Sequence, residues 1–141
     1  MHLTFATAIM NKLFTKRSAS YCILIILSLI VLFHLLVLTG IVPFQIVWGG
    51  RLTNHSQMVQ FEMISIGINI VMLAAVAIYA GILKLHIKPL LIRIVLWCMC
   101  GLFLLNTIGN LLSTNTFEKM VFTPITLLLA ICCFRLAVDK Q

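Results

Sequence analysis

Four long apolar segments constrain this chain more than any other feature. They lie at about residues 19–39, 60–83, 89–112 and 117–138, and each approaches the roughly 20 residues that an α-helix needs to cross a bilayer. Of the 141 residues, 62% are hydrophobic and 9% charged, whereas about a quarter of the residues in a soluble domain are charged. The sequence therefore predicts an all-α membrane protein, a four-helix transmembrane bundle.

Positive charges predict the orientation of these spans. Of the 10 Lys and Arg residues, all but Arg51 and Lys119 fall on one side of the membrane. Because cytoplasmic loops are enriched in Lys and Arg, both termini are expected in the cytoplasm. The net charge of +7 does not indicate a nucleic-acid partner, because the cations stand singly or in small groups between apolar spans. The cytoplasmic set is Lys12, Lys16, Arg17, Lys84, Lys88, Arg93, Arg135 and Lys140.

The chain divides into an N-terminal segment, residues 1–18, and the bundle, residues 19–141. Apolar residues of the first segment follow helical spacing and cations follow them, which predicts a short amphipathic helix at the cytoplasmic membrane surface. A disordered tail, or a true start at Met10, are the alternatives. The first span is longer than the apolar region of a signal peptide and no cleavage site follows it, so a retained span is expected.

Local signals predict where spans three and four begin. The connection at residues 84–88 is short, so spans two and three should be antiparallel neighbours. Pro89 suits the first turn of a helix, where its missing N–H removes no hydrogen bond. Asn115 and Glu118 have capping-box spacing, with Asn115 as the expected cap of span four. Pro124 falls inside that span and should kink it.

Polar side chains gather in the half of the spans that this orientation places outside. Glu62, Ser65 and Asn69 stand at positions i, i+3 and i+7, within about 60° of one another on a helix. An acid at the bilayer centre costs about 2.5–3.5 kcal/mol on insertion scales. This stripe should therefore face the bundle interior, opposite a similar stripe on span three. The second stripe consists of Asn106, Asn110 and Ser113.

The connection between spans one and two is expected to roof these polar groups. Gly49 and Gly50 permit a tight turn, and residues 41–47 are too apolar to float in water. They should dip back onto the bundle as a strand-like or re-entrant piece. Trp48 also suits a second interpretation, an anchor at the membrane interface.

Together these features predict a polar ligand pocket at the extracytoplasmic mouth of the bundle. The alternative is structural, with Asn, Ser and Thr as interhelical hydrogen-bonding groups and Glu62 paired with Arg51. No nucleophile–base pair is evident, and no second metal ligand stands near His34, so neither catalytic residues, a metal nor a cofactor is predicted. The candidate pocket residues are His34, Trp48, Arg51, Glu62, Ser65, Asn69, Asn106 and Asn110.

The run from Ile46 to Leu52, Ile-Val-Trp-Gly-Gly-Arg-Leu, followed by Glu62, Ser65 and Asn69 and by 106–110 (Asn-Thr-Ile-Gly-Asn), resembles a group of small uncharacterised bacterial four-span membrane proteins. The resemblance covers about residues 20–138. It implies the same architecture and a bacterial plasma membrane, and it implies no activity. The small multidrug resistance transporters also have four spans, but they have an essential acid in span one, where this chain has His34.

Three functions compete at this point. The leading prediction is a non-enzymatic accessory, sensing or ligand-binding subunit, with a small ligand or lipid head group, a partner membrane protein or a second copy as its partner. The second is a small ion- or proton-coupled transporter, because Glu62 and His34 are a titratable pair within the membrane. The third is a membrane enzyme acting on lipid or quinone, with His34 or Glu62 as base and Arg51 holding an anionic head group.

Overall fold

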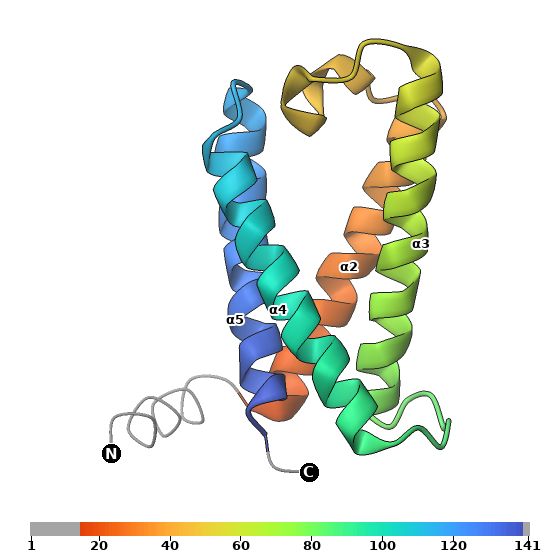
Figure 1. Cartoon of the computed structure of the whole chain (residues 1–141), viewed down its shortest axis with the longest axis vertical. Coiled ribbons are helices and arrows are strands. Elements are labelled where there is room, and N and C mark those ends of the chain that lie inside the picture. Colours follow the sequence, from red (N-terminus) through yellow and green to blue (C-terminus); the bar gives the residue numbers. More distant parts are fainter. Residues whose placement is uncertain (1–14, 140–141) are drawn as a thin grey trace.

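The computed structural model describes residues 15–139 and contains four long helical segments and, within that range, no strand (Figure 1). They are α2 (Lys16–Leu38), α3 (His55–Tyr79), α4 (Pro89–Leu111), and a final segment of η3 (Glu118–Phe122) with α5 (Thr123–Ala137). All four are long and apolar enough to cross a membrane. The predicted all-α four-helix bundle is confirmed. The interfacial helix predicted for the N-terminus lies mostly outside the described residues.

Capping groups place several helix ends differently from the hydropathy pattern. Helix α2 begins at Lys16 rather than 19, where the Thr15 hydroxyl accepts a hydrogen bond from the Ser18 N–H at 3.1 Å. Helix α3 begins at His55 rather than 60, because the Asn54 side chain caps it. It ends at Tyr79 rather than 83, since Gly81 takes a left-handed conformation with φ +72° just beyond the helix.

The start of the fourth span differs from its predicted capping box. The Asn115 side chain accepts a hydrogen bond from the Phe117 N–H at 2.8 Å, so it does cap the segment. Glu118 instead bonds to the connection between α2 and α3, and no reciprocal capping box forms. A π-helical turn, Glu118–Phe122, lies directly before Pro124, and the kink expected at Pro124 stays a prediction. Pro124 then lies in the first turn of α5, where its missing N–H is tolerated.

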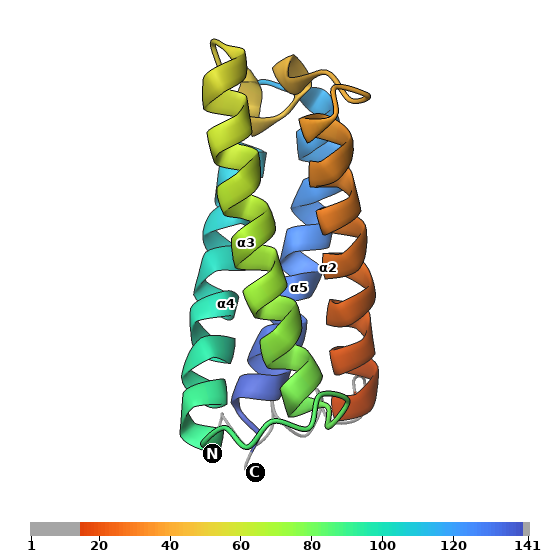
Figure 2. The same ribbon diagram turned by 90° about the vertical axis from the view of Figure 1, so that its right-hand side faces the viewer.

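The helices form two pairs that meet at one end and separate at the other (Figure 1). Helix α2 packs along α3, α4 packs along α5, and contacts between α2 and α5 join the pairs. Helices α3 and α4 are antiparallel, as expected, but contact each other sparsely. The connection between α2 and α3 reaches inward from the separated end of this pair in Figure 1, and Figure 2 shows it between the tops of the two helices. The bundle is therefore wedge-shaped, with its open end beneath this connection.

Apolar packing closes the narrow end and supports the connection at the wide end. The main core is built from buried residues of all four helical segments, among them Ile23, Val76, Leu96 and Leu129. A second, smaller cluster joins Val47 of the connection to Val37 and Met58. Val47 is only 4% exposed, so the connection does dip back onto the bundle. Burying such a side chain contributes about 1.5–3 kcal/mol.

Polar contacts fasten the narrow end, which is the predicted cytoplasmic end. The Asp139 carboxylate lies 2.6 Å from the Lys16 ammonium and accepts a hydrogen bond from the Tyr79 hydroxyl at 3.1 Å. The Arg93 guanidinium donates to the Ala137 carbonyl at 3.0 Å. These contacts join the starts of α2 and α4 to the end of α3 and the end of α5. The start of α2 and the end of α5 thus share one end of the molecule, as four spans require.

Candidate functional site

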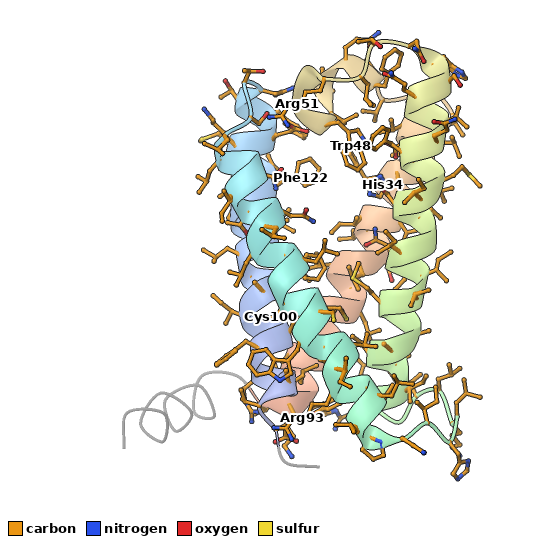
Figure 3. The ribbon with its side chains drawn as sticks, in the orientation of Figure 1. His34, Trp48, Arg51, Arg93, Cys100 and Phe122 are labelled. Carbon is orange, nitrogen blue, oxygen red and sulfur yellow. The ribbon has the colours of Figure 1, made fainter. Side chains whose placement is uncertain are left out.

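A cavity of about 420 Å³ occupies the wide end of the bundle, beneath the connection between α2 and α3. Figure 3 shows His34, Trp48, Arg51 and Phe122 grouped around this end of the molecule. All eight candidate pocket residues line the cavity, so the structure brings together groups from α2, α3, α4 and the connection. That they bind a ligand remains a prediction. These residues are His34, Trp48, Arg51, Glu62, Ser65, Asn69, Asn106 and Asn110.

Glu62 on α3 is fully buried and links three parts of the chain. Its Oε2 lies 2.6 Å from Nδ1 of His34 on α2, and its Oε1 accepts a hydrogen bond from the Trp48 indole N–H at 2.9 Å. The short contact with His34 requires a proton between the two atoms. Glu62 therefore pairs with His34 rather than with Arg51, the partner of the structural alternative.

Trp48 turns its polar atom inward, which an interfacial anchor would not need. Its ring packs against Phe61 with centroids 5.1 Å apart, and the residue is 37% exposed. Part of the ring thus remains available to the membrane interface while the N–H is held by Glu62. Trp48 thus contributes to the roof, and its role as an anchor at the membrane interface stays a prediction.

The connection consists of short turns rather than a strand, so the strand-like part of the prediction was wrong. These are a 3₁₀ turn at Phe44–Ile46 and a turn at Trp48–Gly50 whose dihedral angles are not those of a right-handed helix. Trp48, Gly49 and Gly50 all have positive φ, at 57°, 66° and 68°. Glycine adopts this region without strain, but a tryptophan does not. The hydrogen bond to Glu62 and the packing on Phe61 hold Trp48 there.

Glu118 is a second anchor of the connection that the sequence analysis missed. It is 6% exposed, and its Oε2 accepts hydrogen bonds from the Gly49 N–H at 2.8 Å and from the Ser113 hydroxyl. The Asn115 amide adds a bond to the Ile46 carbonyl at 2.7 Å. In the sequence, the capping-box spacing with Asn115 gives Glu118 a local role at a helix start. The other signal of importance is that Glu118 is one of only 3 acidic residues in the chain. The roof is thus fastened to α3 at one side and to the fourth span at the other.

Some of the remaining polar groups do act as structural hydrogen-bonding groups. The Thr107 hydroxyl of α4 donates to the Thr126 hydroxyl of α5 at 2.9 Å, and the Asn110 amide reaches the same atom at 3.5 Å. The Asn69 amide bonds to the Ser65 carbonyl of its own helix at 2.8 Å. Among residues 15–139, no hydrogen bond joins the stripe of α3 to that of α4. The stripes face the cavity instead.

The cavity opens sideways between α3 and α4. Lining residues on both edges are exposed, Ile68 at 46% and Leu105 at 67%, and Asn106 is exposed beside them. The opening therefore lies between two edges of the bundle that expose mainly apolar side chains.

Comparison of the chain with protein-family models, curated proteins and solved structures found no match. The resemblance to small bacterial four-span proteins therefore stays a prediction. Within residues 15–139, no three His, Cys, Asp or Glu side chains are grouped so that they could hold a metal ion. What the arrangement offers chemically is hydrogen bonding and charge. The cavity itself is the basis for any functional proposal.

Replacing Trp48 with phenylalanine should lower the free energy of unfolding by about 1 kcal/mol, because Glu62 loses one hydrogen-bond donor while the ring packing is kept. Detergent-solubilised protein titrated with SDS would give the value. Trp97, an α4 residue in edge-to-face contact with Phe134, supplies the matched control, and Trp97→Phe should stay within about 0.5 kcal/mol of the parent. Equal effects at both positions would contradict the role given to the Trp48 N–H.

Proposed function

We propose that the protein is a non-enzymatic multi-pass membrane protein whose extracytoplasmic cavity binds a small ligand, in an accessory or sensing role. The observation that carries the proposal is a 420 Å³ cavity, within the roughly 300–1,000 Å³ typical of ligand sites. Three polar groups of its wall are available to bind a ligand. The Arg51 guanidinium, the Ser65 hydroxyl and the Asn106 amide line it and have no hydrogen-bond partner among residues 15–139.

A binding role is favoured over catalysis by how the titratable side chains are used. His34 and Glu62 bond to each other, and Glu62 also holds the roof. Glu118 is occupied by Gly49 and Ser113. All three side chains hold in place the elements that form the cavity. A membrane enzyme acting on lipid or quinone would need one of them free to take a proton from its substrate.

The charge distribution supports an orientation with the cavity outside and both termini in the cytoplasm. The narrow end includes Lys16, Arg93 and Arg135, while the wide end has Arg51 and Lys119. Because cations are retained on the cytoplasmic side, the roof would face the exterior. A bacterial plasma membrane, which the resemblance to small four-span bacterial proteins implies, is part of this proposal.

Filling the cavity tests the ligand-binding function. Gly109 lines the cavity, and a Cβ added there meets no atom within 4 Å. Gly109→Phe should therefore fold normally while its ring occupies the ligand's space. Small molecules that co-purify with the protein, measured by native mass spectrometry, should fall about tenfold, a loss of about 1.4 kcal/mol in binding.

Gly101 supplies the control, because it lies on the same helix, is exposed, and has equal room for a Cβ, but does not line the cavity. Gly101→Phe should retain the parent's bound molecules. Equal retention by Gly109→Phe and Gly101→Phe, with both proteins folded, would overturn the function proposed for this cavity.

A second candidate function is an ion- or proton-coupled transporter, favoured by the 2.6 Å contact between His34 and Glu62. A proton shared between two titratable groups within a membrane span is a common element of proton relays. Proton-linked flux into proteoliposomes that is abolished by Glu62→Gln would support this function. Flux unchanged by that substitution, or no proton-linked uptake, would reject it in favour of binding alone.

A further inference from the structure

Arg51 places at the roof of the cavity a cation that no acidic side chain among residues 15–139 neutralises. The residue is exposed and lines the cavity, and its guanidinium has no carboxylate or carbonyl acceptor among residues 15–139. A Cβ built on Gly49 would lie 3.5 Å from its Nε, so the side chain lies over that glycine. The two acids of the wall, Glu62 and Glu118, are engaged elsewhere. A guanidinium has five N–H donors, suited to a carboxylate or phosphate.

The floor of the cavity is apolar. Ile30 lies one turn closer to the narrow end than His34, and Met72 and Phe103 lie about one turn closer to that end than Asn69 and Asn106 on the same helices. Polarity therefore falls along the cavity, from the guanidinium at the roof to hydrocarbon side chains at the floor. A ligand that matches this gradient has an anionic head and an apolar body.

The sideways opening determines from which phase such a ligand arrives. Ile68, Leu102 and Leu105 line the cavity and are exposed on the edges of α3 and α4. In a membrane, acyl chains contact these residues directly. The roof above is fastened by Glu62 and by Glu118. An amphipathic molecule in the bilayer thus meets an open side, whereas a soluble anion meets the fastened roof.

We propose that the ligand is an anionic lipid that enters between α3 and α4 and pairs its head group with Arg51, an inference that rests on the ligand-binding function proposed above. A cavity of about 420 Å³ accommodates a head group and its backbone. The acyl chains extend through the opening into the bilayer. The amide of Asn106 and the hydroxyl of Ser65 stand on the two sides of that opening, where the polar backbone of the lipid would pass.

Reconstitution into nanodiscs tests the charge requirement. Nanodiscs of phosphatidylcholine, with and without phosphatidylglycerol, supply the probe, and native mass spectrometry reports the lipid that stays bound after the bulk is stripped. The parent should retain phosphatidylglycerol over phosphatidylcholine. Arg51→Gln should lower that retention roughly tenfold or more, as expected for a lost charge-assisted bond.

Lys119→Gln is the matched control, since Lys119 is an exposed cation at the same end that does not line the cavity. It should leave retention unchanged. Equal retention of both lipids by the parent, or equal loss in Arg51→Gln and Lys119→Gln, would overturn the proposal in favour of a neutral ligand or of general attraction to the membrane surface.

The entry route is tested by a pair of neighbouring substitutions on α4. Leu105 lines the opening, whereas Leu104 is exposed beside it and does not line the cavity. Leu105→Trp should lower phosphatidylglycerol retention and Leu104→Trp should not. Displacement of the lipid by soluble glycerol 3-phosphate at the parent's cavity would show that the anion comes from water, which would overturn the lipid assignment.

The same assay separates this inference from the function on which it rests. Retention that depends on Gly109→Phe but not on Arg51→Gln leaves ligand binding standing and overturns the anionic lipid. Retention that depends on neither substitution removes both.

Discussion

Replacing Glu62 with alanine is expected to lower the free energy of unfolding by about 2–4 kcal/mol, the largest effect of any single substitution at the site. The carboxylate is fully buried and accepts from the Trp48 indole while it contacts the His34 ring. Its removal leaves two partners on separate elements without a counterpart. SDS-titrated unfolding of the purified protein, followed by circular dichroism, would measure the loss.

Two further variants distinguish this network from a general effect of mutating α3. Glu62→Gln keeps an acceptor for Trp48 and a group that can bond His34, so its loss should be about half that of Glu62→Ala or less. Met63 is 56% exposed on the lipid-facing side, and Met63→Ala should change stability by about 0.5 kcal/mol or less. A Glu62→Ala protein as stable as Met63→Ala would contradict the network.

Replacing Glu118 with alanine should release the roof on its other side. The Gly49 N–H loses a hydrogen bond to a charged group, which contributes about 1.5–3 kcal/mol. Amide hydrogen exchange in the segment around Gly49 should therefore accelerate on the order of ten- to a hundredfold. Exchange followed by peptide mass spectrometry would resolve this segment from the helices.

The neighbouring Lys119→Gln serves again as the control, because Lys119 is exposed and outside the cavity wall. It should leave exchange around Gly49 at the parent rate. If Glu118→Ala exchanges as slowly as this control, the roof is held by its apolar contact through Val47 and the tether assigned to Glu118 is wrong.

Much of the site could be predicted because the bilayer imposes a simple rule on polar residues. Side chains that hydrocarbon cannot solvate must turn inward, and spacing of three and four residues places them on one helical face. This reasoning placed Glu62 and Asn69 on one interior face opposite Asn110, and all three line the cavity. It also predicted that the connection would return to the bundle, because its apolar residues could not remain in water.

The rest of the site depends on contacts between residues that are far apart in the chain, and no local sequence pattern predicts such contacts. Gly49 and Glu118 are 69 residues apart in the chain and meet only through the folded arrangement of all four spans. The π-helical turn before Pro124 has no sequence signal separable from that of an ordinary proline-containing helix. The early start of α3 was missed because Asn54 lies in a polar run, where hydropathy does not detect a cap.

The separation of α3 from α4 also could not be predicted from the sequence. Polar stripes on both helices suggested that they face each other, and they do share one cavity. Hydropathy cannot distinguish stripes in contact from stripes across a gap. The exposed fractions of Ile68 and Leu105 reveal the gap only once the helices are placed, and that gap is what gives the proposed ligand its route.

Thiol modification can test most directly whether these polar faces enclose one water-accessible cavity. In a protein whose native cysteines are replaced, Ser65→Cys places a thiol on the cavity wall and Ile64→Cys places one on the exposed apolar face of the same helix. A small uncharged maleimide can enter through the sideways opening, but it reacts only with thiolate, which requires water. In detergent micelles the thiol at 65 should react, the thiol at 64 should not, and adding Gly109→Phe from the opposite wall should slow the reaction at 65. Equal reactivity at 64 and 65, untouched by Gly109→Phe, would mean that α3 and α4 do not share a cavity.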